Sequence, residues 1–176
     1  MIQPPRRTIP PGHPIRNLFQ TLTERGLEQT RLRDPETIRY IADLLTDFID
    51  VENLRRMKND SGAVTNVFDM MRQAVDATTT EERRACYQHV GDVTLFSLGL
   101  FPESLTYGRQ TVSPEFYAEQ GRRSYQIVAA LDGSRQTIVF RKLSFEFERC
   151  VAGLNWVKLY INDPFYQYVF REFGVT

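Results

Sequence analysis

The most constraining feature of the sequence is a capped segment that becomes almost wholly apolar. Thr79 is followed three residues later by Glu82, the pattern of a reciprocal capping box at a helix start. Between residues 93 and 101 nearly every residue is apolar, so a helix here has no face suited to water. Pro102 cannot continue a helix and disfavours helical geometry at the residue before it. The segment therefore predicts a buried central helix over about residues 80–101.

Small residues on this helix predict that other helices approach it closely. A glycine inside a helix costs about 1 kcal/mol relative to alanine, so Gly91 and Gly99 need a packing reason. They lie eight residues apart and therefore on nearly the same face. Farther along, Tyr117, Gly121 and Tyr125 recur every four residues on one face of another expected helix. This glycine between two phenol rings complements the glycines of the central helix.

Two segments carry a resemblance to a known family. They are GDVTLFSLGLFPE, from Gly91 to Glu103, and YAEQGRRSY, from Tyr117 to Tyr125. Together they resemble an uncharacterised family of small bacterial all-helical proteins that share a GDxxLFxxGLFPE segment. The likeness covers most of the chain from about His13 onward and suggests common descent. It implies a helical fold, and it implies no activity, substrate or catalytic residue.

Length and composition indicate one soluble domain. The chain has 176 residues, 41% of them hydrophobic, with 22 basic and 22 acidic side chains. Zero net charge gives no overall field for polyanions, so no nucleic-acid partner is expected. No apolar run reaches the roughly 18 residues of a membrane span, and no leader peptide is evident. Two isolated cysteines, Cys86 and Cys150, make no disulfide framework, which favours the reducing cytoplasm.

The expected fold is an all-α, single-domain bundle of six to seven helices around the central one. Residues 1–14 are predicted to be a disordered proline-rich arm, and residues 15–176 a single helical domain. Asp34-Pro35 and Ser113-Pro114 are strong helix-start signals. The predicted helices begin at residue 15 and then cover about 35–50, 64–77, 80–101, 114–131 and 135–161, with a short one from residue 164. Polar links are expected at 55–62 and 106–112.

One segment is ambiguous between helix and strand. Within residues 137–149, Leu143, Phe145 and Phe147 alternate as they would in a strand. Over a longer window, however, apolar residues recur at steps of three and four up to Ile161, and this length favours a single long helix over about 135–161. After Pro164, aromatic residues crowd nearly all faces of the last helix. Such a helix either fills the core or meets another subunit, which makes self-association through it the expected partnership.

A metal centre on the central helix is disfavoured. Cys86, His89 and Asp92 are spaced three apart, so neighbouring pairs share a face. Three ligands on consecutive turns span about 9 Å of helix axis and do not easily converge on one ion. A zinc site needs four donors, or three and a water, and only one other histidine exists in the chain, in the N-terminal arm. No metal or cofactor is predicted, and His89 is interpreted as a partly buried hydrogen-bonding residue.

Asp92 enters an otherwise apolar run and should therefore have partners. A buried carboxylate without donors is costly, so we expect it to meet a cation, a phenol or backbone amides. The candidates are Arg122, Arg123, Tyr125 and Lys158. An interhelical bond is the preferred interpretation, and a catalytic acid or base is the alternative.

Three functions of different classes follow. The sequence has no nucleophile elbow, phosphate-binding loop, dinucleotide fingerprint or zinc-protease motif, which favours a non-enzymatic cytoplasmic interaction or regulatory module, with a homodimer as one form. A second hypothesis is a binder of a small apolar ligand or cofactor in an interhelical cavity. A third is an enzyme using Asp92, His89 and a tyrosine, which requires these groups to converge on an open pocket. The candidate ligand-binding residues are His89, Asp92, Phe96, Tyr117, Tyr125 and Trp156.

Overall fold

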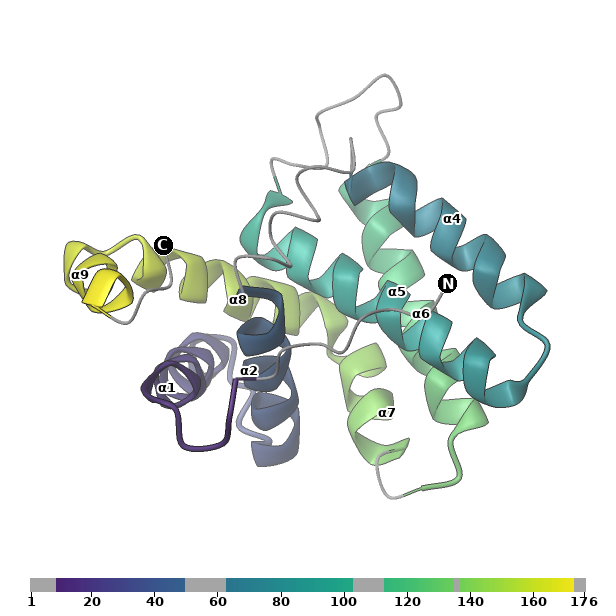
Figure 1. Ribbon diagram of the computed structural model, residues 1–176, viewed down its shortest axis with the longest axis horizontal. Coiled ribbons are helices and arrows are strands. Elements are labelled where there is room, and N and C mark those ends of the chain that lie inside the picture. The colour runs from purple at the N-terminus through teal and green to yellow at the C-terminus, as the bar shows by residue number, and fades with distance from the viewer. Residues whose placement is uncertain (1–8, 50–62, 103–112, 135–136, 173–176) are drawn as a thin grey trace.

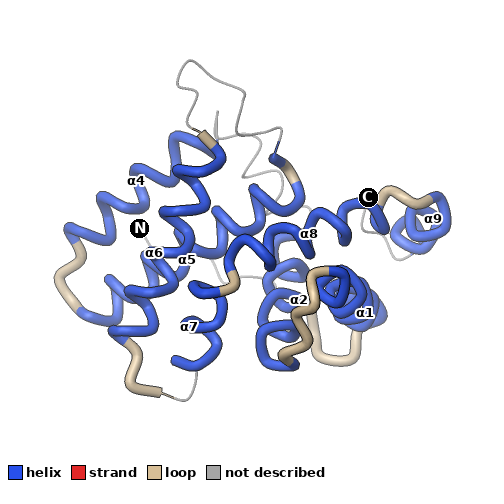
Figure 2. Tube along the Cα trace, turned by 180° about the vertical axis from the view of Figure 1, so that it is seen from behind, coloured by secondary structure: helices blue, strands red, loops and turns tan. Residues whose placement is uncertain are grey.

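The computed structural model describes residues 9–49, 63–102, 113–134 and 137–172, and every regular element among them is a helix (Figures 1 and 2). The expected links at 55–62 and 106–112 and the first eight residues of the expected arm lie outside this part. The helices are α1 (Pro14–Gln29), α2 (Pro35–Ile49), α4 (Ala63–Asp76), α5 (Thr80–Leu100), α6 (Pro114–Leu131), α7 (Thr137–Phe145), α8 (Phe147–Ile161) and α9 (Pro164–Glu172). The predicted all-α bundle is confirmed.

Helix α5 is the central helix, as predicted. Its start is a complete capping box, in which the Glu82 amide donates to Thr79 Oγ1 at 3.1 Å and the Thr79 amide donates to the Glu82 carboxylate at 3.3 Å. Every residue from Val90 to Leu100 is buried. The helix contacts α2, α4, α6 and α8, so its apolar surface is covered from several directions.

The glycines of α5 admit two different neighbours. A Cβ added at Gly91 would lie 2.7 Å from the ring of Tyr125 on α6, whereas one at Gly99 would overlap Leu154 on α8. Gly121 on α6 faces Thr94 of α5 and the ring of Phe147. The predicted close approach at these glycines is therefore confirmed, with α6 and α8 sharing the space.

The single long helix expected over 135–161 is wrong, although its helical character is confirmed. The chain bends at Glu146, where φ is −100° and ψ is 19°, and separates α7 from α8. Tertiary packing explains the bend, because α7 packs against α6 and α2 while α8 packs against α1 and α5. The bend leaves Phe147 fully buried and Phe145 83% exposed. None of the described helices has the length and apolarity needed to cross a lipid bilayer.

Candidate functional site

The candidate site is built around the carboxylate of Asp92, near the middle of α5. Asp92 is only 8% exposed, and its Oδ1 accepts hydrogen bonds from two phenols: Tyr40 Oη on α2 at 2.7 Å and Tyr125 Oη on α6 at 2.8 Å. The two tyrosine rings meet edge to face, with centroids 6.4 Å apart. One carboxylate oxygen therefore joins three helices at a single level of the bundle.

A chain of polar groups connects this carboxylate to the surface. Gln88, one turn before Asp92 on α5, donates from Nε2 to Tyr40 Oη at 3.0 Å. Arg84, a further turn back, donates to Gln88 Oε1 at 3.3 Å and to Asp132 Oδ2 at 3.0 Å. Asp132 lies just after α6 and accepts a bond from the Ser134 amide. The polar side chains of α5 therefore line one helix edge, since they are spaced four residues apart.

The environment keeps both tyrosines protonated. Burial is the main cause that raises the pKa of Tyr125 well above its ordinary value, and the nearby negative charge of Asp92 adds to it. The pKa of Tyr40 is raised for the same reasons, burial first and Asp92 second. Neither phenol loses its proton or acts as a base near neutral pH. Both hydroxyls donate their protons in hydrogen bonds to the Asp92 carboxylate. We call this arrangement of Tyr40, Asp92 and Tyr125 the clamp.

Alkaline pH should unfold the protein through these two phenols. Below the ordinary tyrosine pKa of 10.0 both the folded and the unfolded chain keep these protons, so this contribution to stability is complete. Above that pH the unfolded chain loses them first, and the free energy of unfolding should fall by about 1.4 kcal/mol per pH unit for each tyrosine. Urea denaturation between about pH 9.5 and about pH 11 measures this slope. Tyr125→Phe should reduce this slope by the contribution of one tyrosine. An unchanged slope would contradict the raised pKa of Tyr125.

The clamp borders a surface pocket of about 330 Å³. Tyr40, Gln88, Phe140 and Val139 form part of its wall, and charged side chains from α2 form the rest. Asp92 itself does not line it. A ligand here would meet the Tyr40–Gln88 edge of the network, while the carboxylate remains behind the phenol.

The other candidate residues have different surroundings. Phe96 is buried against the ring of Phe48. The Phe48 ring also stacks on His89, with centroids 6.5 Å apart. Tyr117 on α6 is buried, and its ring meets that of Phe116 edge to face. Trp156 is 43% exposed on α8, against Tyr160.

The pockets of about 390, 330 and 700 Å³ are not lined by any of the six candidate ligand-binding residues, His89, Asp92, Phe96, Tyr117, Tyr125 and Trp156. Of these six, Asp92 and Tyr125 are joined by a hydrogen bond.

Tyr40 is the functional neighbour that sequence reasoning misses. Of the four partners proposed for Asp92, Tyr125 is confirmed, whereas Arg122 and Arg123 are exposed on α6. The only sequence signal for Tyr40 is its place beside the apolar stripe of α2, next to Ile41 and one turn before Leu44. That position predicts partial burial, but it does not predict which helix the phenol meets.

The described residues contain two free thiols and no group of three potential metal ligands. No group of three His, Cys, Asp or Glu side chains within the described ranges is placed to hold a metal ion. Cys86 and Cys150 are free thiols, and burial raises the pKa of Cys150 to about 12. A thiol of this kind is protonated and weakly nucleophilic at neutral pH.

Comparison with known proteins gives no match: no family model fits the chain, and no curated protein or solved structure is significantly similar to it. The resemblance to small bacterial helical proteins therefore stays a prediction.

Proposed function

We propose that the protein is a non-catalytic helical interaction module that forms a homodimer through the outer surface of α8 and α9. The observation that carries this proposal is a set of large apolar side chains in water on these two helices. Their exposed fractions are 43% for Trp156, 60% for Leu159, 66% for Phe165 and 58% for Tyr168. We call these four residues the aromatic face. Exposed apolar patches of this kind are typical of protein–protein contacts.

The two sides of α8 differ sharply. Its inner side is formed by Gly153, Leu154 and Val157, which are buried against α1 and α5. Trp156 and Leu159 lie three residues apart and therefore project from a common side of the helix, outside that contact. The side of α8 that packs against the core is therefore formed by other residues than these two.

Helix α9 is attached to α8 by local hydrogen bonds. Asp163 Oδ1 accepts from the Phe165 amide at 2.9 Å, and Gln167 Nε2 donates to the Ile161 carbonyl at 2.6 Å. Figure 1 shows α9 at the edge of the molecule, beyond α1 and α8. In this position it extends the apolar surface of α8 outward, where another molecule can reach Phe165 and Tyr168.

Charge balance favours a second copy of the same chain as the occupant. The charged residues on and between these helix ends are Lys158, Asp163, Arg171 and Glu172, two of each sign. A twofold interface places a patch opposite itself, so a patch with one dominant sign would repel its copy. Balanced charges around an aromatic centre avoid this repulsion and match the usual polar rim of an interface.

The central network supports the non-catalytic part of the proposal. Asp92 is committed to two protonated phenols, and His89 stacks on Phe48. A carboxylate acting as a general base needs access to the proton that it takes. Here the phenol of Tyr40 lies between the carboxylate and the pocket that Tyr40 and Gln88 line.

Sedimentation velocity across a range of protein concentrations tests the dimer. Leu159→Glu and Phe165→Glu should each weaken association at least about tenfold, because burying such a side chain contributes roughly 1.5–3 kcal/mol and each substitution occurs twice per dimer. Ile138→Glu is the matched control, since Ile138 is 53% exposed on α7, outside the aromatic face. A wild-type chain that stays monomeric up to about 100 μM would rule out the proposed dimer, because its dissociation constant would then be larger than that of a specific complex.

A further inference from the structure

Another exposed aromatic side chain lies on a different surface, away from the aromatic face. Phe145, the last residue of α7, is 83% exposed, the largest exposed fraction among the large apolar residues of the described chain. Two pockets adjoin at this residue, one of about 390 Å³ on the α1–α2 side and one of about 700 Å³ between α6 and α7. Arg141 lines both pockets as well. We call this continuous surface the Phe145 face.

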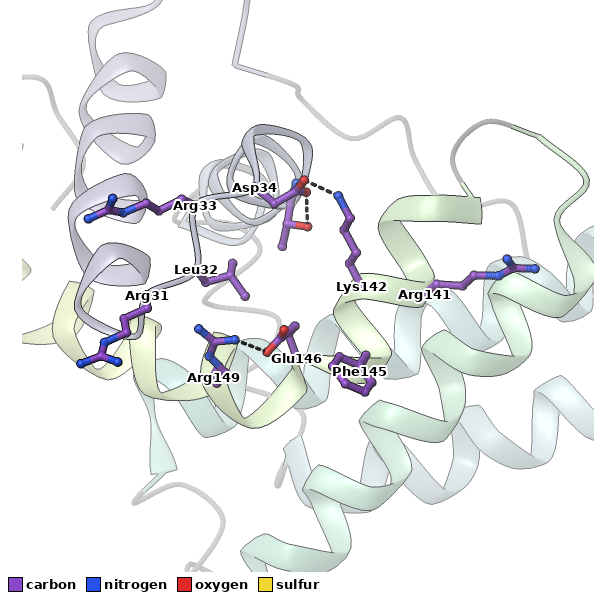
Figure 3. A pocket seen from close by; sticks show the side chains of 10 residues that line it. Arg31, Leu32, Arg33, Asp34, Arg141, Lys142, Phe145, Glu146 and Arg149 are labelled. Carbon is purple, nitrogen blue, oxygen red and sulfur yellow. Dashed lines mark hydrogen bonds and ion pairs between the residues drawn. The ribbon is translucent and has the colours of Figure 1, made fainter.

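The first pocket is rich in cations (Figure 3). Its cationic residues are Arg31, Arg33, Arg141, Lys142 and Arg149. Lys142 pairs with Asp34 and Arg149 pairs with Glu146 at 2.7 Å, as the dashed lines in Figure 3 show. Arg33 pairs with Glu28 at 3.0 Å, outside the lining of the pocket. The guanidinium groups of Arg31, Arg33 and Arg141 extend outward from the pocket in this view.

The second pocket continues the positive surface onto α6. Arg122 and Arg123 line it together with Arg141, and its only carboxylate, Glu119, pairs with Arg122. Counted over both pockets, seven cationic side chains face three carboxylates. Each of these carboxylates has a cationic partner, and Glu28 outside the lining pairs with Arg33, so seven cationic side chains meet four carboxylates and the net charge of the face is positive. A chain with zero net charge therefore carries a local excess of positive charge.

The outward spread of the arginines indicates the form of the ligand. A single phosphate or carboxylate is bound by donors that converge on it. The arginines here diverge, so an extended polyanion that crosses the face can meet them one after another. An exposed aromatic ring between the two cationic pockets adds a flat apolar surface, which is the second element of single-strand recognition.

We propose that the Phe145 face binds single-stranded nucleic acid, with the arginines along the phosphates and a base stacked on Phe145. Duplex DNA or RNA keeps its base faces covered and cannot stack on this ring. An acidic peptide supplies the charge but not a planar group at each repeat. The proposal concerns a surface distinct from the aromatic face of α8 and α9, so it does not depend on dimer formation.

Fluorescence anisotropy with a fluorescein-labelled oligouridylate of about 12 nucleotides tests the proposal. We expect a micromolar dissociation constant at about 50 mM salt and a slope of roughly −3 in a plot of log affinity against log salt, as about four neutralised phosphates give. Phe145→Ala should weaken binding about tenfold without changing this slope, because it removes stacking and no charge. Arg141→Glu should weaken binding and lower the magnitude of the slope.

The controls separate this site from general electrostatic attraction. Arg72→Glu makes the same charge change on α4, at a side chain that is 77% exposed, and should leave binding within about twofold. Phe145 and Arg141 are both exposed, so their variants should keep the wild-type helical circular dichroism. The proposal is overturned if no binding occurs at low salt, or if Arg72→Glu weakens binding as much as Arg141→Glu. Preference for a blunt duplex, or for phosphatidylserine–phosphatidylcholine vesicles over the oligonucleotide, also overturns it.

Discussion

Asp92→Ala should lower the free energy of unfolding by about 3–5 kcal/mol. The substitution removes the acceptor of two hydrogen bonds, and bonds to a charged group are worth about 1.5–3 kcal/mol each. It also leaves the fully buried hydroxyl of Tyr125 without this acceptor. For a chain of this length each kcal/mol corresponds to roughly 2–4 °C, so the melting temperature should fall by at least about 6 °C. Thermal and urea denaturation followed by circular dichroism measure both quantities.

The identity of the lost interaction can be checked in variants that keep or remove its partners. Asp92→Asn retains a carbonyl oxygen and should cost clearly less than Asp92→Ala. In a Tyr125→Phe background no buried hydroxyl is orphaned, so Asp92→Ala should cost at least about 1 kcal/mol less there than in the wild type. A loss below about 1 kcal/mol in the single variant, near the ordinary effect of a substitution, would show that the clamp does not hold the three helices together.

Gly26→Ala should destabilise the protein by about 2 kcal/mol, although alanine favours helix by about 1 kcal/mol. Gly26 lies on α1 where it crosses α8, and an added Cβ would be 2.5 Å from the Gly153 carbonyl oxygen and 2.7 Å from Val157 Cγ2. A flexible side chain can rotate away from such a contact, whereas a helix backbone cannot. The two helices must separate, and the buried residues around the crossing lose their packing.

Gly133→Ala is the matched control for this prediction. Gly133 follows α6, has an exposed position, and would place its Cβ with no atom within 4 Å. The free energy of unfolding of this variant should differ from that of the wild type by no more than about 0.5 kcal/mol. Equal effects of the two substitutions in urea denaturation would contradict the claim that α1 and α8 meet backbone to backbone.

The central helix is the part of the fold that local sequence predicts best. Its start depends on Thr79 and Glu82, three residues apart, and its burial follows from apolar residues on all sides. Ser113 likewise caps α6 through the Phe116 amide at 3.2 Å. These signals are local, because a cap or a helical period involves residues within one or two turns of each other.

The candidate site is predicted only in part. The expectation that a carboxylate in an apolar run needs donors leads to Asp92 and includes Tyr125 among the candidates. Tyr40 is 52 residues away from Asp92, and no local pattern states that α2 and α5 will place these side chains within 2.7 Å. The expected cavity lining of Phe96, Tyr117, Tyr125 and Trp156 likewise rests on aromatic character, which says nothing about location; the structure buries the first three and leaves Trp156 43% exposed.

By itself, the sequence determined which segments are helical, where several of them start, and that one of them must be buried. Only the tertiary structure decided the bend at Glu146, the meeting of Tyr40 with Asp92, and the grouping of arginines around Phe145. The physical reason is the range of the interactions. Helix propensity, capping and periodicity act between near neighbours, whereas a charged surface or a shared hydrogen bond exists only after distant helices have packed against one another.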